Sequence, residues 1–150
     1  AEIIQLFDSW AGIMNEQQFH RWSIEPTRQI VNRLRESCPG VPLIGFPRNV
    51  GPLAEPFVID TGINAISLDQ DTSLEWIAET LQPKCTVQGN LDNQVLVEGG
   101  EILDRETMAI LKALSKGPFI FNLGHGIRPT AKITCVEALA ETVSQHFPGS

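Results

Sequence analysis

The sequence predicts an α/β protein in which five short strands form a parallel sheet covered by helices. Five short apolar segments alternate with segments of helical periodicity along the 150 residues. The apolar segments are continuous rather than alternating with polar positions, which is typical of strands buried on both faces. Polar residues follow several of these segments, and parallel strands bring such ends to one edge of a sheet.

Each predicted strand is a short apolar run bounded by polar residues, glycine or proline. The five runs cover residues 3–7, 41–46, 63–68, 85–88 and 119–122. The stretches between them are long enough for the crossover that parallel pairing requires, and the right-handed crossover rule winds all of them in one direction. Periodicity does not distinguish an open doubly wound sheet from part of a closed barrel.

Helices are predicted between the strands from apolar spacing and from capping residues. Their ranges are about 16–24, 26–37, 53–61, 73–81, 101–116 and 133–145, with one possible turn within 91–97. Asn15 and Ser73 are suitable N-caps, and Gly62 supplies a left-handed C-cap. Pro26 separates the first two helices, because proline suits a first helical turn and interrupts a helix interior.

Composition indicates one globular domain and excludes several classes of function. Hydrophobic residues make up 42% of the chain and the net charge is −7. The lysines and arginines form no cluster, so nucleic-acid binding is not expected. No apolar run approaches the ~20 residues of a membrane span, and no signal peptide is visible. The chain starts at Ala1, close to a predicted strand, so we expect that the natural start lies upstream.

The three cysteines and three tryptophans are expected to be structural. Cys38, Cys85 and Cys135 are far apart and lack metal-binding spacing, which predicts neither a disulfide framework nor a zinc site. We expect them to be small buried residues in a reducing cytoplasm. The tryptophans are expected to be core aromatics.

The most informative run is Gly124-His125-Gly126, directly after the last predicted strand. The flanking glycines let backbone and ligand approach closely, and histidine donates, accepts or carries charge near neutral pH. A ligand-binding histidine on an exposed loop is one interpretation. A glycine-rich turn with an incidental histidine is the other.

Two further runs share this layout of a strand followed by polar residues: Phe-Asp-Ser-Trp-Ala-Gly at 7–12 and Gln-Gly-Asn-Leu-Asp at 88–92. Together with Asn-Leu-Gly-His-Gly-Ile at 122–127, they resemble the uroporphyrinogen decarboxylase family in order and spacing. The resemblance covers essentially the whole chain but only about the C-terminal half of the family's pattern. It implies that residues 1–150 are the C-terminal part of a single (β/α)8 TIM-barrel domain.

The implied fold is an incomplete barrel made of the fourth to eighth βα units. A complete TIM barrel needs eight strands and about 250 residues, so five strands do not close it. Two unpaired edge strands, 3–7 and 119–122, would then remain, and such edges invite further pairing. We expect the chain to be a fragment of a longer protein or half of an assembly.

The resemblance also implies an activity, namely removal of carboxyl groups from the four acetate side chains of uroporphyrinogen III to give coproporphyrinogen III in haem biosynthesis. The implied enzyme is a cytoplasmic carboxy-lyase that uses no cofactor and no metal, binds a tetrapyrrole, and is a homodimer at full length. The family's pocket aspartate belongs to a motif upstream of Ala1, so no catalytic residue is assigned within this chain. Turnover is expected only with the missing N-terminal half.

Four residues are predicted to bind substrate. By resemblance, Ser9 and His125 match substrate-binding positions and Phe7 lines the same cleft. Arg48 follows a predicted strand and offers positive charge to a carboxylate. A loop-capping hydroxyl is the alternative role for Ser9.

Several other polar residues are expected to shape loops. Asn90 and Asn122 are expected to brace the loops that follow their strands, with contact to substrate as the alternative role for either. The chain departs from the family's usual residues at Gln70, Asn93 and Arg128, which bears on loop shape.

Two other functions remain open from the sequence. One is a corrinoid-linked methyltransferase of the same superfamily, which holds zinc through a His-x-Cys pair and a further cysteine. The corresponding strand end here reads Phe-Pro-Arg at 46–48 and carries no such ligand. The other is a catalytically inactive or binding-only half-barrel.

Overall fold

The computed structural model of the chain, which describes residues 1–146, contains one five-stranded parallel sheet. Its strands are β1 (Ile4–Asp8), β2 (Leu43–Pro47), β3 (Ala65–Ser67), β4 (Thr86–Leu91) and β5 (Phe119–Leu123). They lie side by side in the order of the chain, β1-β2-β3-β4-β5, and every neighbouring pair is parallel. The predicted five strands and the α/β class are therefore confirmed.

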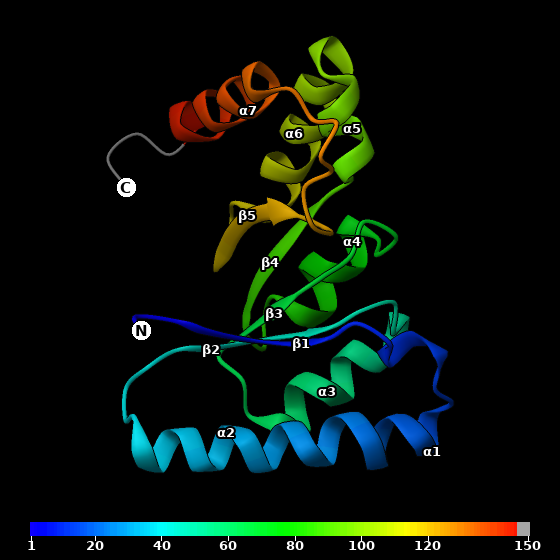
Figure 1. Cartoon of the computed structure of the whole chain (residues 1–150), viewed down its shortest axis with the longest axis vertical. Coiled ribbons are helices and arrows are strands. Elements are labelled where there is room, and N and C mark those ends of the chain that lie inside the picture. Colours follow the sequence, from blue (N-terminus) through cyan, green and yellow to red (C-terminus); the bar gives the residue numbers. More distant parts are fainter. Residues whose placement is uncertain (147–150) are drawn as a thin grey trace.

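Helical segments connect the strands and follow the last one. They are η1 (Ala11–Ile13), α1 (Glu16–Phe19), η2 (His20–Ile24), α2 (Glu25–Ser37), η3 (Gly51–Leu53), α3 (Ala54–Thr61), α4 (Leu74–Trp76), η4 (Ile77–Leu81), α5 (Asn93–Glu98), α6 (Gly100–Leu114) and α7 (Ile133–His146). Figure 1 shows α2 and α3 beside the β1–β2 end of the sheet, and α5, α6 and α7 at the β5 end. Within residues 1–146, none of these helices is both long and apolar enough to cross a lipid bilayer.

The sheet is open, as a partial barrel requires. Strands β1 and β5 are the two outer strands and do not pair with each other. Two short edges of this kind are what remains when a barrel of parallel strands lacks some of its units. The chain therefore contains five βα units of a barrel-like sheet, and the barrel is not closed.

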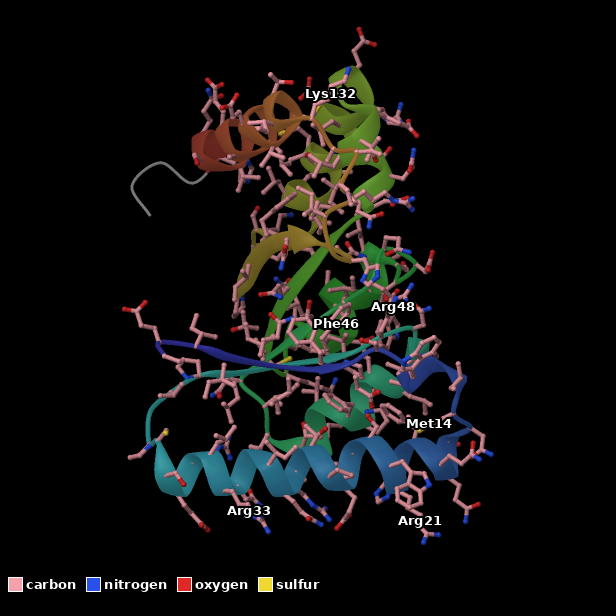
Figure 2. The ribbon with its side chains drawn as sticks, in the orientation of Figure 1. Met14, Arg21, Arg33, Phe46, Arg48 and Lys132 are labelled. Carbon is pink, nitrogen blue, oxygen red and sulfur yellow. The ribbon has the colours of Figure 1, made fainter. Side chains whose placement is uncertain are left out.

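The predicted helix break before Pro26 is wrong. The helical run continues without a gap from Glu16 to Ser37, because η2 is a wide π-helical turn in which the Glu25 N–H donates to the His20 carbonyl oxygen. Pro26 lies in the first turn of α2, as predicted, directly after the π-helical turn, and the predicted bounds 16–24 and 26–37 match the structure to within one residue. On the outer side of this run, Arg21 and Arg33 extend away from the sheet (Figure 2).

The predicted caps are present, and one strand is longer than expected. The Asn15 side chain accepts from the Gln18 N–H in a reciprocal capping box, and Gly62 adopts a left-handed φ of 74°. Strand β4 continues to Leu91, three residues past its predicted end. The predicted turn within 91–97 becomes α5, whose N-cap Asp92 accepts from the Gln94 N–H at 2.8 Å.

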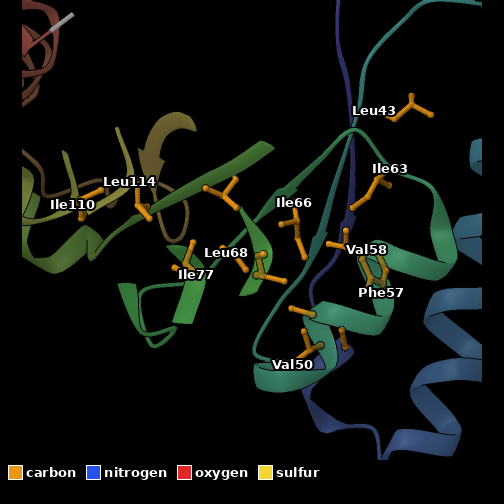
Figure 3. Packing of buried hydrophobic residues seen from close by; sticks show 14 of the residues in the cluster. Leu43, Val50, Phe57, Val58, Ile63, Ile66, Leu68, Ile77, Ile110 and Leu114 are labelled. Atoms are coloured by element: carbon orange, nitrogen blue, oxygen red, sulfur yellow. The ribbon is translucent and has the colours of Figure 1, made fainter. Parts of the chain in front are cut away.

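The core lies between the outer face of the sheet and the helices that cover it. Ile66 from β3 is fully buried beside Ile77 and Leu81 of η4, and Leu111 of α6 is fully buried further along the sheet. Figure 3 shows Ile66, Leu68 and Ile77 in this packing, with Ile110 and Leu114 of α6 beyond them. Burial of these side chains from water is the main force that holds the helices on the sheet.

Two tryptophans and Cys38 are exposed, contrary to the expectation of burial, and Cys85 and Cys135 are only half-buried. Trp10 is 73% exposed in the turn after β1, and Trp22 is 62% exposed. Trp22 borders a groove beside the edge strand β1. Within residues 1–146 no further βα unit packs beside this strand, and the tryptophan ring therefore stays exposed. Trp76 packs against the core as predicted, whereas Cys38 is exposed because it caps the C-terminus of α2 at the surface.

Truncation of the α6 core residue Leu111 should destabilise the protein strongly. Leu111→Ala removes a fully buried side chain and leaves a cavity, so we expect a loss of about 2–5 kcal/mol in the free energy of unfolding. Met108→Ala on the same helix is the matched control, because Met108 is 46% exposed. Urea unfolding measures both. Equal losses in the two variants would contradict this packing.

Candidate functional site

A cavity of about 320 Å³ lies on the inner face of the sheet, toward the carboxyl ends of the strands. Phe7 of β1, Phe46 of β2 and Ser67 of β3 line it, together with His125 and Gly126 of the loop after β5. Because all five strands are parallel, residues far apart in the sequence meet at this edge. Of the four predicted site residues, the structure brings Phe7 and His125 to one cavity.

The apolar wall of the cavity is formed by two phenylalanines. Phe7 and Phe46 are register partners on neighbouring strands, and their rings meet edge to face with centroids 6.0 Å apart. Phe46 is buried, but Phe7 is 68% exposed on the open inner face. A large aromatic side chain exposed beside a cavity is a surface suited to an apolar, planar partner.

Two residues that line the cavity, Gln5 and Ser67, belong to a polar network that sequence reasoning missed. Gln88 of β4 donates its Nε2 protons to Ser67 Oγ at 3.0 Å and to Gln5 Oε1 at 3.3 Å. Ser67 and Gln88 are register partners, and both are buried. Polar residues within otherwise apolar strands are the sequence signal that could have indicated this network. The sequence does not show which of these side chains are hydrogen-bonded to each other, because that depends on how the strands pair.

The loop that carries His125 is fixed against the neighbouring strand. The Gly124 N–H donates to the Leu91 carbonyl oxygen at 2.7 Å, and Gly124 is buried. A Cβ atom at position 124 would lie 2.4 Å from the backbone nitrogen of Gln70. Glycine is therefore required for the close approach of this loop, and His125 itself is exposed at the cavity.

Within residues 1–146, Ser9 and Arg48 lie outside the group that lines the cavity, and each follows a lining phenylalanine by two positions in the sequence. Ser9 is exposed in the turn after β1, and the Arg48 N–H donates to the carbonyl oxygen of Asp8 at 3.1 Å. Arg48 is half-buried, and its Nε is buried without a hydrogen-bond partner in the described part of the chain. Figure 2 places Arg48 beyond Phe46 toward the carboxyl end of β2.

Polar residues at or just after the carboxyl ends of β3 and β4 brace loops. Asp69 is buried, and its carboxylate accepts from the Asn49 N–H at 2.8 Å and from the Thr72 hydroxyl at 3.1 Å. Asn90 donates to the carbonyl oxygens of Asp69 at 3.0 Å and Thr72 at 2.9 Å, as predicted for a bracing residue. Asn122, expected to have the same role, lies at the cavity and accepts from the N–H of Leu123.

The cysteines lie away from this chemistry. All three are free thiols, and burial raises the pKa of the Cys85 thiol to about 11, with small opposing effects from a backbone hydrogen bond and a nearby lysine. Such a thiol stays protonated and unreactive near neutral pH. Among residues 1–146, no group of three or more histidine, cysteine, aspartate or glutamate side chains is arranged to hold a metal ion.

A second hollow, of about 750 Å³, lies on the outer side of the molecule between the α1–η2 run and α3. Phe19, Arg21 and Pro56 are among the residues that line it. It is larger than the inner cavity but lies between helices on the outside, whereas active sites of barrels open on the inside, where the strands end. We therefore place the candidate site at the inner cavity.

The fold and the inner cavity define a class: a barrel-type α/β protein with a cavity where its parallel strands end. Residues 1–146 match the family model for uroporphyrinogen decarboxylase (URO-D). The chain is 50% identical over 143 residues to the uroporphyrinogen decarboxylase of Rhodospirillum rubrum, covering 95% of this chain and 41% of the relative. It is 45% identical over 143 residues to that of Paracoccus denitrificans, covering 95% and 42%. The chain belongs to the uroporphyrinogen decarboxylase family.

The match to the curated relatives covers nearly all of this chain but less than half of each relative. The chain spans about two fifths of the length of these curated relatives. Among solved structures, a methyltransferase from Methanosarcina mazei superposes with a TM-score of 0.78 and 19% sequence identity, covering 98% of this chain and 43% of that one. At that identity the likeness supports the barrel-like fold alone.

Substitution of the two glycines beside His125 should change the free energy of unfolding by different amounts. Gly124→Ala places a methyl group against the Gln70 backbone, so we expect a loss of about 1–3 kcal/mol in the free energy of unfolding. Gly126→Ala meets nothing within 4 Å and should be neutral or slightly stabilising. Thermal and urea unfolding measure both. A harmless Gly124→Ala would show that the loop is not held as described.

Proposed function

We propose that this chain is the C-terminal part of a single uroporphyrinogen decarboxylase TIM-barrel domain. The whole enzyme would remove the carboxyl groups of the four acetate side chains of uroporphyrinogen III to give coproporphyrinogen III, a step of haem biosynthesis. The observation that carries the proposal is the meeting of Phe7 and His125 at one cavity on the inner face of the sheet, in a chain of this family.

The cavity and the residues that follow β1 and β2 offer the two kinds of contact that a tetrapyrrole needs. Phe7 and Phe46 present apolar surface to the pyrrole rings. His125, Ser9 and Arg48 offer donors to the acetate and propionate carboxylates, and a protonated His125 would donate a charge-assisted hydrogen bond. This local supply of donors matters because the chain as a whole carries a net charge of −7.

The chemical problem is the pair of electrons left behind when carbon dioxide departs from an acetate group. Protonation of the pyrrole ring makes it an electron sink, so that the carbon–carbon bond electrons move into the ring as carbon dioxide leaves. A proton then adds to the exposed methylene carbon, which becomes a methyl group, and the ring loses its extra proton. The residues of this chain hold the macrocycle in one orientation for these steps.

The remaining parts of the proposal concern the complete enzyme. The groups that handle protons at the pyrrole ring are proposed to lie in the part of the barrel outside these residues, so no catalytic residue is assigned here. No cofactor and no metal are invoked for the reaction. The full-length enzyme is proposed to be a cytoplasmic homodimer. The 150 residues by themselves are proposed to lack turnover.

Activity of the full-length protein tests the function directly. Incubation with uroporphyrinogen III should give partly decarboxylated intermediates and then coproporphyrinogen III, separated by chromatography after oxidation. The isolated 150-residue chain should give no product. Turnover by the isolated chain would refute the requirement for the rest of the barrel. No turnover by the full-length protein, together with stoichiometric zinc in metal analysis, would favour the methyltransferase alternative.

His125→Ala should lower kcat/KM of the full-length enzyme about tenfold or more, because one donor to a substrate carboxylate is lost. His20→Ala is the matched control, since His20 is exposed on the π-helical turn η2 and lines the outer hollow. Steady-state kinetics with uroporphyrinogen III measures both. Unchanged kinetics in His125→Ala would remove this histidine from the site.

A further inference from the structure

The loop that carries His125 is tied to the neighbouring βα unit by one asparagine side chain. Asn93 is the first residue of α5 and is 7% exposed. Its Nδ2 donates to the Gly126 carbonyl oxygen at 2.7 Å, and its Oδ1 accepts from Arg128 Nε at 3.0 Å. Both ends of one amide group therefore contact the same loop, at residues one and three positions after His125.

The orientation of this amide follows from the chemistry of its partners. A backbone carbonyl oxygen only accepts and an arginine Nε only donates, so the Asn93 amide satisfies both in one orientation alone. A residue with only a donor or only an acceptor would lose one of the two contacts. The pair Asn93 and Arg128 is therefore chemically specific, although the residues are 35 positions apart in the sequence.

The helix α5, which carries the Asn93 amide, is fixed by its N-cap and by core packing. Asp92 caps α5 by accepting from the Gln94 N–H at 2.8 Å, and Leu96 of the same helix is 1% exposed in the core. On the other side of His125, the Gly124 N–H is bonded to the Leu91 carbonyl oxygen. His125 thus lies between two anchored glycines, and both anchors come from the β4–α5 segment.

We propose that Asn93 and Arg128 form a clamp that positions His125 in the substrate cavity, an inference that rests on the proposed function. Gly126, which accepts the hydrogen bond from Asn93, lines that cavity next to His125. Arg128 is exposed and lies outside the lining group among the described residues, so it acts through Asn93. The hydrogen bond from Arg128 Nε holds the Asn93 amide in one orientation. The amide in turn holds the Gly126 carbonyl group, and so the backbone next to His125. Both are positioning residues for substrate binding.

Kinetics of the full-length enzyme tests the clamp. Asn93→Ala should raise KM for uroporphyrinogen III about tenfold with little change in kcat, because a misplaced donor weakens binding. Arg128→Ala should raise KM about threefold, and the double variant should match Asn93→Ala, because Arg128 acts only through Asn93. Gln94→Ala is the control, since the described contact of that side chain is with Glu98 on the same helix.

A conservative variant and a spectroscopic readout separate positioning from a general loss of stability. Asn93→Asp keeps an acceptor for Arg128 but loses the donor to Gly126, so it should raise KM as Asn93→Ala does. In protein labelled with ¹³C at histidine Cε1, Asn93→Ala and Asn93→Asp should shift the His125 resonance and leave the His20 resonance unchanged. The control Gln94→Ala should leave both resonances and the thermal midpoint of unfolding unchanged. Arg128 is exposed, so Arg128→Ala keeps the test open if Asn93→Ala fails to fold.

The outcomes distinguish the clamp from the function on which it rests. Wild-type KM and an unshifted His125 resonance in Asn93→Ala would overturn the clamp. Multiplicative effects of the two single variants in the double variant would overturn the action of Arg128 through Asn93. A shifted His125 resonance in a protein that does not decarboxylate uroporphyrinogen III would refute the proposed function and leave the clamp in place. Loss of activity in His125→Ala but not in Asn93→Ala would support the proposed function and overturn the clamp.

Discussion

Parallel pairing in chain order is the constraint on which the rest of the structure depends. Each strand pairs with the next one along the sequence, from Ile4 opposite Leu43 at one edge to Leu91 opposite Leu123 at the other. Every crossover must therefore return over the outer face, where its helix packs on the core, and every strand ends at the same edge. That edge collects Phe7 and His125, which are separated by most of the chain.

The same constraint explains the exposed apolar surface at the two ends of the sheet. A groove of about 200 Å³ beside β1 is lined by Leu6 and Trp22, and one of about 360 Å³ beside β5 is lined by Phe121 and Leu139. In a closed barrel, each such groove receives the next βα unit. This fits a chain that spans about two fifths of its relatives' length, and it supports the proposal that the remaining units complete the domain.

The sequence predicted the strand centres and the family because both depend on local runs of residues. Strand β4 extends past its predicted end because the polar side chains of Gln88 and Asn90 find partners on β3 and on the loop after it, which hydrophobicity does not reveal. Pro26 predicted a break because sequence rules do not foresee a π-helical turn before it. The hydrogen bond between Asn93 and Arg128 joins the start of α5 to the loop after β5, and it becomes visible only in the fold.

The central claim is that the open inner face of this sheet is the tetrapyrrole site. The most direct test is a crystal structure of the full-length protein with coproporphyrinogen III bound. The account predicts that the macrocycle packs against the ring of Phe7 and that a carboxylate lies within hydrogen-bond distance of the His125 imidazole. A macrocycle bound away from the inner cavity, with neither side chain in contact, would contradict it.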